Sequence, residues 1–195
     1  YTYTHYAEVT SSDGEGNAAT NAFWNPTTLS FDFSYYMSQH GYSSADVVFI
    51  NLGTNDYIRG THKTDGEVLE AWTAIVNSIH SYDSNIKIVL WLCPPACLRN
   101  GIGAVQISIV CQYNMRKLIT NNFRCLAWGE NDIWIMPSHL CIDPIYDFPS
   151  HVIAKDDYNI ETIVEATDTT HLNDNGYHHL ANPIIAMIKY LGSLS

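Results

Sequence analysis

The chain has 195 residues, of which 46% are hydrophobic and 15% charged, so it can bury a sizeable core and is too apolar to be disordered. Its 20 acidic residues outnumber its 9 basic residues and give a formal net charge of −11. This balance argues against nucleic acid and anionic membrane surfaces as partners, because both are bound through Lys and Arg. No apolar run reaches the roughly 20 residues that span a bilayer, and the length favours a single domain over residues 1–195.

Residues 1–41 are rich in Tyr, Asn, Thr and Ser and contain several turn signals, which predicts a long ordered excursion. Its aromatic side chains are expected to pin it to the rest of the fold: Phe23, Trp24, Phe31, Phe33, Tyr35 and Tyr36. The next segment, residues 45–52, is a continuous apolar run that ends at Gly53. Such a run is typical of a strand that is buried on both faces, as in a parallel sheet.

Residues 65–82 place apolar side chains three and four positions apart, which predicts an amphipathic helix with Asp65 near its start. Residues 86–92 form a second apolar strand that Pro94 stops. A second helix over 104–121 and a third strand over 132–136 follow.

Residues 137–167 show no clean period and predict a long loop, of the kind that proteins often keep for function. The last helix is predicted over 174–191, where Pro183 should kink it or split it. Strands that alternate with helices in this way are typical of a doubly wound α/β sheet with right-handed crossovers. Ligands of such sheets bind beyond the carboxyl ends of the strands.

The first candidate motif is Gly53-Thr54-Asn55-Asp56, at the carboxyl end of the first predicted strand. Glycine lets the backbone turn sharply off the strand, and Asn55 would then present an N–H donor of the kind that stabilises an oxyanion. Taken alone the motif is weak, because a pattern this short occurs by chance in about a few per cent of chains of this length. The structural alternative is a strand-ending turn in which Asn and Asp form hydrogen bonds with their own backbone.

The second candidate motif is Asp168-Thr169-Thr170-His171, just before the last helix. A carboxylate three residues before a histidine can accept the imidazole Nδ1–H and leave Nε2 free as a base. A helix cap region with a surface histidine is the structural alternative.

The two motifs, together with the longer pattern His171-Leu172-Asn173-x-x-Gly176-Tyr177, resemble the SGNH (GDSL) hydrolase family. The resemblance runs from about Phe23 to the end of the chain. It implies a three-layer α/β/α sandwich with a mostly parallel, flavodoxin-like sheet, and ester cleavage by a serine nucleophile. At the matching positions it implies that Asn55 belongs to the oxyanion hole, that Asp168 is the acid of a catalytic triad and that His171 is the general base.

One part of the family pattern is missing. Members open with a strand that leads into Gly-Asp-Ser, whose serine is the nucleophile, and this sequence contains no Gly-Asp-Ser. Ser11 and Ser12 lie in polar sequence and follow no apolar strand. Because the first strand is central in such sheets, its loss would leave an unpaired edge beside the 47–52 strand. We therefore expect an N-terminally incomplete domain, whose first strand and serine come from upstream of Tyr1 or from a companion chain.

With that serine in place, His171 would deprotonate it, Asn55 would hold the oxyanion and water would resolve the acyl-enzyme. The resemblance implies no metal and no cofactor. The expected partner is a small acyl ester or an acylated carbohydrate, by analogy with the family.

Two other functions fit parts of the sequence. A non-catalytic structural or glycan-binding module would explain the absent serine and the 13 Tyr and 5 Trp, whose faces could stack on sugars. A metal hydrolase would draw its ligands from a cluster of His and Asp near the end of the chain: His171, His178, His179, Asp168 and Asp174. Consecutive histidines on a helix point about 100° apart, however, which makes joint ligation by His178 and His179 awkward.

Overall fold

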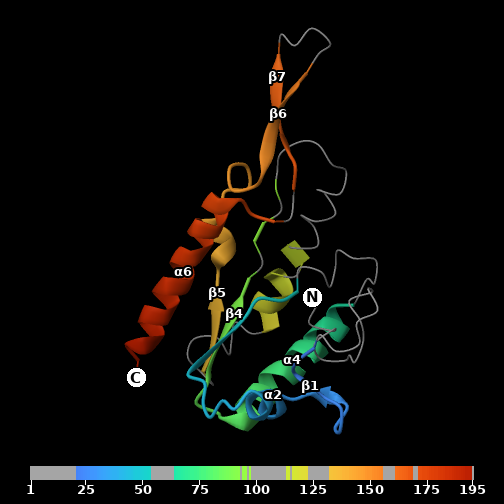
Figure 1. Cartoon of the computed structure of the whole chain (residues 1–195), viewed down its shortest axis with the longest axis vertical. Coiled ribbons are helices and arrows are strands. Elements are labelled where there is room, and N and C mark those ends of the chain that lie inside the picture. The colour runs from blue at the N-terminus through green and yellow to red at the C-terminus, as the bar shows by residue number, and fades with distance from the viewer. Residues whose placement is uncertain are drawn as a thin grey trace. The chain divides into compact units, whose positions relative to one another are not determined.

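The computed structural model describes residues 21–53, 64–92, 94–95, 97, 113–114, 116–122, 132–155, 161–168 and 171–194. In chain order its elements are β1 (Trp24–Asn25), β2 (Ser30–Phe31), α2 (Phe33–Gln39), β3 (Val47–Ile50), α4 (Asp65–Tyr82), β4 (Lys87–Trp91), β5 (Ile133–Met136), the 3-10 helix η2 (Ser138–Cys141), β6 (Ser150–Ala154), β7 (Thr162–Ala166) and α6 (Asp174–Gly192) (Figure 1). The chain divides into two compact units, Tyr1–Trp91 with Met115–Ile135, and Leu92–Asn114 with Met136–Ser195.

The first unit is built on a three-stranded sheet in the order β3-β4-β5. Strands β3 and β4 run parallel, with Val47 opposite Lys87 and Ile50 opposite Leu90. Parallel neighbours need a crossover connection, and α4 lies between them in the chain. The α/β class with parallel strands is thereby confirmed, and the three predicted strands form within two residues of their expected ends.

Helix α4 forms because its sequence provides both an N-terminal cap and an apolar face that packs in the core. At its start Thr64 accepts a hydrogen bond from Glu67 N, and the Glu67 carboxylate accepts one from Thr64 N, which makes a capping box. Its buried residues recur every three or four positions and face the core: Val68, Ala71, Trp72, Ile75, Val76 and Ile79. The predicted bounds 65–82 are those of the helix.

The described part of the expected excursion, residues 21–41, is ordered by aromatic stacking. The ring centroid of Phe23 lies 5.1 Å from that of Phe31 and 4.1 Å from that of Tyr36. Phe33 N donates to Ser78 Oγ at 3.0 Å, which ties α2 to α4. The role predicted for the aromatics is confirmed for Phe23, Phe31, Phe33 and Tyr36, whose rings contact one another. Residues 1–20 lie outside the described residues.

The expectation of a long loop over 137–167 is wrong for much of that range. It contains η2 and an antiparallel pair in which β6 and β7 align from Ser150 opposite Ala166 to Ala154 opposite Thr162 (Figure 1). Both strands expose apolar side chains, among them Val152 and Val164. Since neither face of the pair is buried along its length, the sequence carries no alternation from which strands could be predicted.

The last helix, α6, ends one residue beyond the predicted range, and Pro183 does not split it. A proline inside a helix removes one backbone hydrogen bond. The buried Leu180 and Leu191 on either side of Pro183 hold the helix against its unit. Of the predicted 104–121 helix, residues 113–114 and 116–121 are helical and 104–112 lie outside the described residues.

No helix in the described ranges is long and apolar enough to cross a membrane.

Candidate active site

The first candidate motif is only partly visible. Gly53 lies three residues beyond the end of β3 and has a φ of 108°, a backbone conformation that favours glycine. The next residues, 54–63, lie outside the described residues, and Asn55 is among them. Its place in an oxyanion hole therefore stays a prediction.

The second motif brings Asp168 and His171 together. The Nδ1 atom of His171 lies 2.8 Å from Asp168 Oδ2, and the backbone N–H of His171 donates to Asp168 Oδ1 at 2.9 Å. The carboxylate thus holds both the ring and the backbone of the histidine. With Nδ1–H donating to Asp168, Nε2 is the nitrogen whose lone pair can accept a proton. The pair can therefore work as a base with its orienting acid.

This pair is open to solvent, since the side chain of His171 is 72% exposed and that of Asp168 is 38% exposed. An exposed ion pair contributes little to stability. Its value is orientation, because the carboxylate selects one tautomer and one ring direction.

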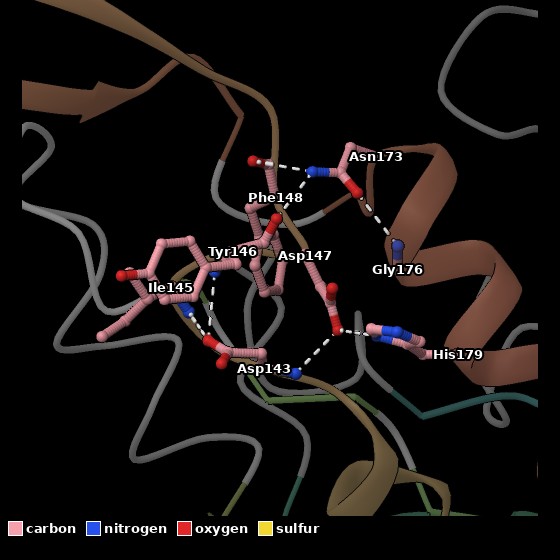
Figure 2. A network of polar contacts seen from close by, with 8 residues as sticks. All are labelled: Asp143, Ile145, Tyr146, Asp147, Phe148, Asn173, Gly176 and His179. Atoms are coloured by element: carbon pink, nitrogen blue, oxygen red, sulfur yellow. Dashed lines mark hydrogen bonds and ion pairs between the residues drawn. The ribbon is translucent and has the colours of Figure 1, made fainter.

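Both ends of the segment that holds the pair are attached to residues 146–149. Before the pair, Thr167 N donates to Pro149 O at 2.9 Å. After it, the Asn173 amide nitrogen donates to Tyr146 O at 2.8 Å and to Phe148 O at 3.2 Å. The backbone N–H of Asn173 donates to Asp147 O at 2.9 Å. Figure 2 shows the Asn173 side of this attachment.

A second histidine and aspartate pair supports residues 146–149 through the side chain of Asp147. Asp147 is 1% exposed, and its Oδ2 atom lies 2.8 Å from His179 Nδ1 on α6 (Figure 2). The same oxygen accepts Asp143 N at 2.7 Å. A buried carboxylate is tolerated only when it is paired and hydrogen-bonded, and both conditions are met here. This pair, 32 residues apart in the chain, was not predicted from the sequence.

Two of the three histidines considered for a metal site have separate partners, since His171 binds Asp168 and His179 binds Asp147. Over the described ranges, no three His, Cys, Asp or Glu side chains gather in a group that could hold a metal ion.

Comparison with known proteins places the chain in a family. The family model described as GDSL-like Lipase/Acylhydrolase matches residues 14–184. The chain belongs to the GDSL family. The resemblance predicted from the two motifs together is thereby confirmed, and ester hydrolysis is the reaction class of this family.

A solved structure supports the same fold. The crystal structure of a mutant acetyl esterase with an acetate ion is similar to the GDSL chain, with a TM-score of 0.58 and 14% sequence identity. The alignment covers 100% of this chain and 70% of that chain. At this identity the likeness shows the fold alone. The search of curated proteins gives no match.

Proposed function

We propose that this chain carries the general base, its orienting acid and one oxyanion donor of a serine-dependent ester hydrolase. His171 is the base, Asp168 orients it, and Asn55 donates to the oxyanion. The observation that supports this most is the 2.8 Å contact between His171 Nδ1 and Asp168 Oδ2, because it directs the free Nε2 away from the carboxylate.

In this proposal His171 Nε2 takes the proton of a serine hydroxyl while the serine oxygen attacks the ester carbonyl carbon. The negative charge moves to the carbonyl oxygen, where Asn55 and backbone N–H groups donate hydrogen bonds. Collapse of the intermediate breaks the bond to the alcohol, which leaves with the proton from Nε2. Water then repeats the sequence on the acyl-enzyme and releases the acid.

We also propose that the nucleophilic serine lies on a segment outside residues 1–195 that pairs with the open edge of β3. Among the described strands, β3 has β4 on one side and no strand on the other. A mostly apolar cavity of about 320 Å³ lies along β3 and is lined by Phe23, Phe31, residues 48–50, Ile75 and Ile79. An open edge beside an apolar groove favours the addition of an extended apolar strand. The strand that precedes Gly-Asp-Ser in the family has this character.

The proposed substrate class is a small acyl ester, such as an acetyl group on a carbohydrate. The similar solved structure is an acetyl esterase, which supports acetyl as the acyl group by analogy. The 72% exposure of the His171 side chain supports a carbohydrate as the alcohol part of the ester, because an exposed base can approach an ester on a bulky, hydrated sugar.

The test is acetate release from an acetylated oligosaccharide by the full-length protein. We expect catalytic turnover. One equivalent of a fluorophosphonate should abolish it, because fluorophosphonates block activated serines. A protein that retains the oligosaccharide but releases no acetate and takes up no fluorophosphonate would instead be the non-catalytic glycan-binding module.

A further inference from the structure

The hydrogen bond between His171 and Asp168 fixes the ring against the carboxylate, yet it does not fix the pair against the rest of its unit. Both hydrogen bonds of His171 within the described residues go to Asp168. The side chain is also largely exposed, so packing holds it little. A base has to be held within a fraction of an ångström of its working position, since a displacement of about 1 Å can cost about 10²-fold in rate. Its position must then come from the neighbouring residues.

Asn173 makes more hydrogen bonds than a helix cap needs. Its Oδ1 atom accepts Gly176 N at 2.9 Å, which caps α6. For that task Asp and Ser would serve about as well as Asn, because only an acceptor is required. The Asn173 amide also donates to two carbonyl groups, those of Tyr146 and Phe148, and its backbone N–H donates to the carbonyl between them. The two amide donors are therefore not explained by capping.

The segment that receives these bonds is itself fixed. The buried Asp147 carboxylate accepts Asp143 N and binds His179, and Asp143 Oδ1 accepts Ile145 N at 2.7 Å and Tyr146 N at 3.0 Å (Figure 2). Phe148, the next residue along, is buried. Residues 146–149 thus form a firm support for the bonds that they accept.

We propose that Asn173 is a positioning residue for His171. The four consecutive carbonyl groups of residues 146–149 hold Thr167 on one side of the pair and Asn173 on the other. Loss of the two side-chain donors of Asn173 leaves only its backbone N–H bonded to Asp147 O at the His171 end. Asp168 stays tethered through Thr167, so the bond between the two side chains loosens. The inference rests on the proposed role of His171 as the general base.

The deciding variant is Asn173→Asp in the full-length protein. Aspartate keeps the acceptor for Gly176 N and is a favoured cap, but it donates nothing and places a carboxylate against two carbonyl oxygens. Asn173→Ser keeps a cap acceptor without the added charge and decides the matter if the aspartate variant does not fold. Asn175→Asp is the matched control, because it makes the same change at an exposed position of the first turn of α6.

Two readouts separate positioning from capping. In ¹⁵N-histidine NMR spectra, we expect His171 of the wild type to show one tautomer with Nδ1 protonated, and both Asn173 variants to show a tautomer mixture. We expect kcat for acetate release to fall by about 10²-fold with KM nearly unchanged, while Asn175→Asp behaves as wild type. The NMR readout needs no turnover, so it tests this inference even if the proposed function fails. If both Asn173 variants keep the wild-type His171 spectrum, and kcat within about twofold, Asn173 is a helix cap alone and the inference is overturned.

Discussion

Replacing Asp168 by Asn should lower kcat for ester hydrolysis by about 10⁴-fold, a loss of the size that removing the orienting acid has in a serine triad. The new side-chain amide would place an N–H donor or an amide oxygen where the Asp168 carboxylate now accepts the His171 Nδ1–H. If the amide donates, Nδ1 becomes the acceptor and Nε2 carries the proton. The ring is then in the tautomer that cannot deprotonate a serine. The measurement is steady-state turnover of p-nitrophenyl acetate by the full-length protein.

Glu165→Gln is the matched control for this change, since Glu165 is a carboxylate on β7 three residues before Asp168 and lies 3.6 Å from His151. It should leave kcat near the wild-type value. Residues that act as a unit are not additive, so combining Asp168→Asn with His171→Ala should lower kcat no further than His171→Ala alone. An Asp168→Asn protein that keeps kcat within about tenfold of the wild type would remove Asp168 from the mechanism.

Replacing Gly176 by Ala should destabilise the protein by about 2–3 kcal/mol, in the upper range for overpacking a filled site. A Cβ atom at Gly176 would lie 2.5 Å from Asp147 O and 2.9 Å from the Cβ atom of Leu172. The first of these is a backbone atom of the fixed 146–149 segment and cannot move aside cheaply. The measurement is the shift of the urea unfolding midpoint.

The control for Gly176 is Gly66→Ala, at the start of α4. A Cβ atom at Gly66 would meet nothing nearer than Thr64 Oγ1 at 3.9 Å. Because Ala has the higher helix propensity and fewer unfolded conformations, this change should be neutral or stabilise the protein by up to about 1 kcal/mol. Equal unfolding midpoints for the two variants would show that α6 does not approach Asp147 as closely as described.

The sequence predicts well those features that neighbouring residues decide. Helix α4 has both of its determinants in one stretch, an apolar residue every three or four positions and a capping box from Thr64 to Glu67. The contact between Asp168 and His171 is equally local, since three residues separate them. For the same reason, the cap that Asn173 provides for Gly176 is encoded within one helical turn.

Features that depend on distant residues could not be predicted. The pair formed by Asp147 and His179 joins residues that are 32 positions apart, and neither has a neighbour in the sequence that marks it. Gly176 is a sequence signal for the approach of Asp147 to α6, because a glycine in the first turn of a helix can indicate that another backbone lies close. The strands β6 and β7 were missed because each exposes side chains on both faces, which removes the alternation that reveals a strand.

The measurement that tests the central proposal most directly is the rate at which a fluorophosphonate labels the full-length protein, with and without His171→Ala. We predict that the wild type is labelled on one serine, in a peptide outside residues 1–195, and that His171→Ala slows the labelling by at least about 10³-fold. Labelling of His171→Ala at the wild-type rate would contradict the assignment of His171 as the base that activates the serine.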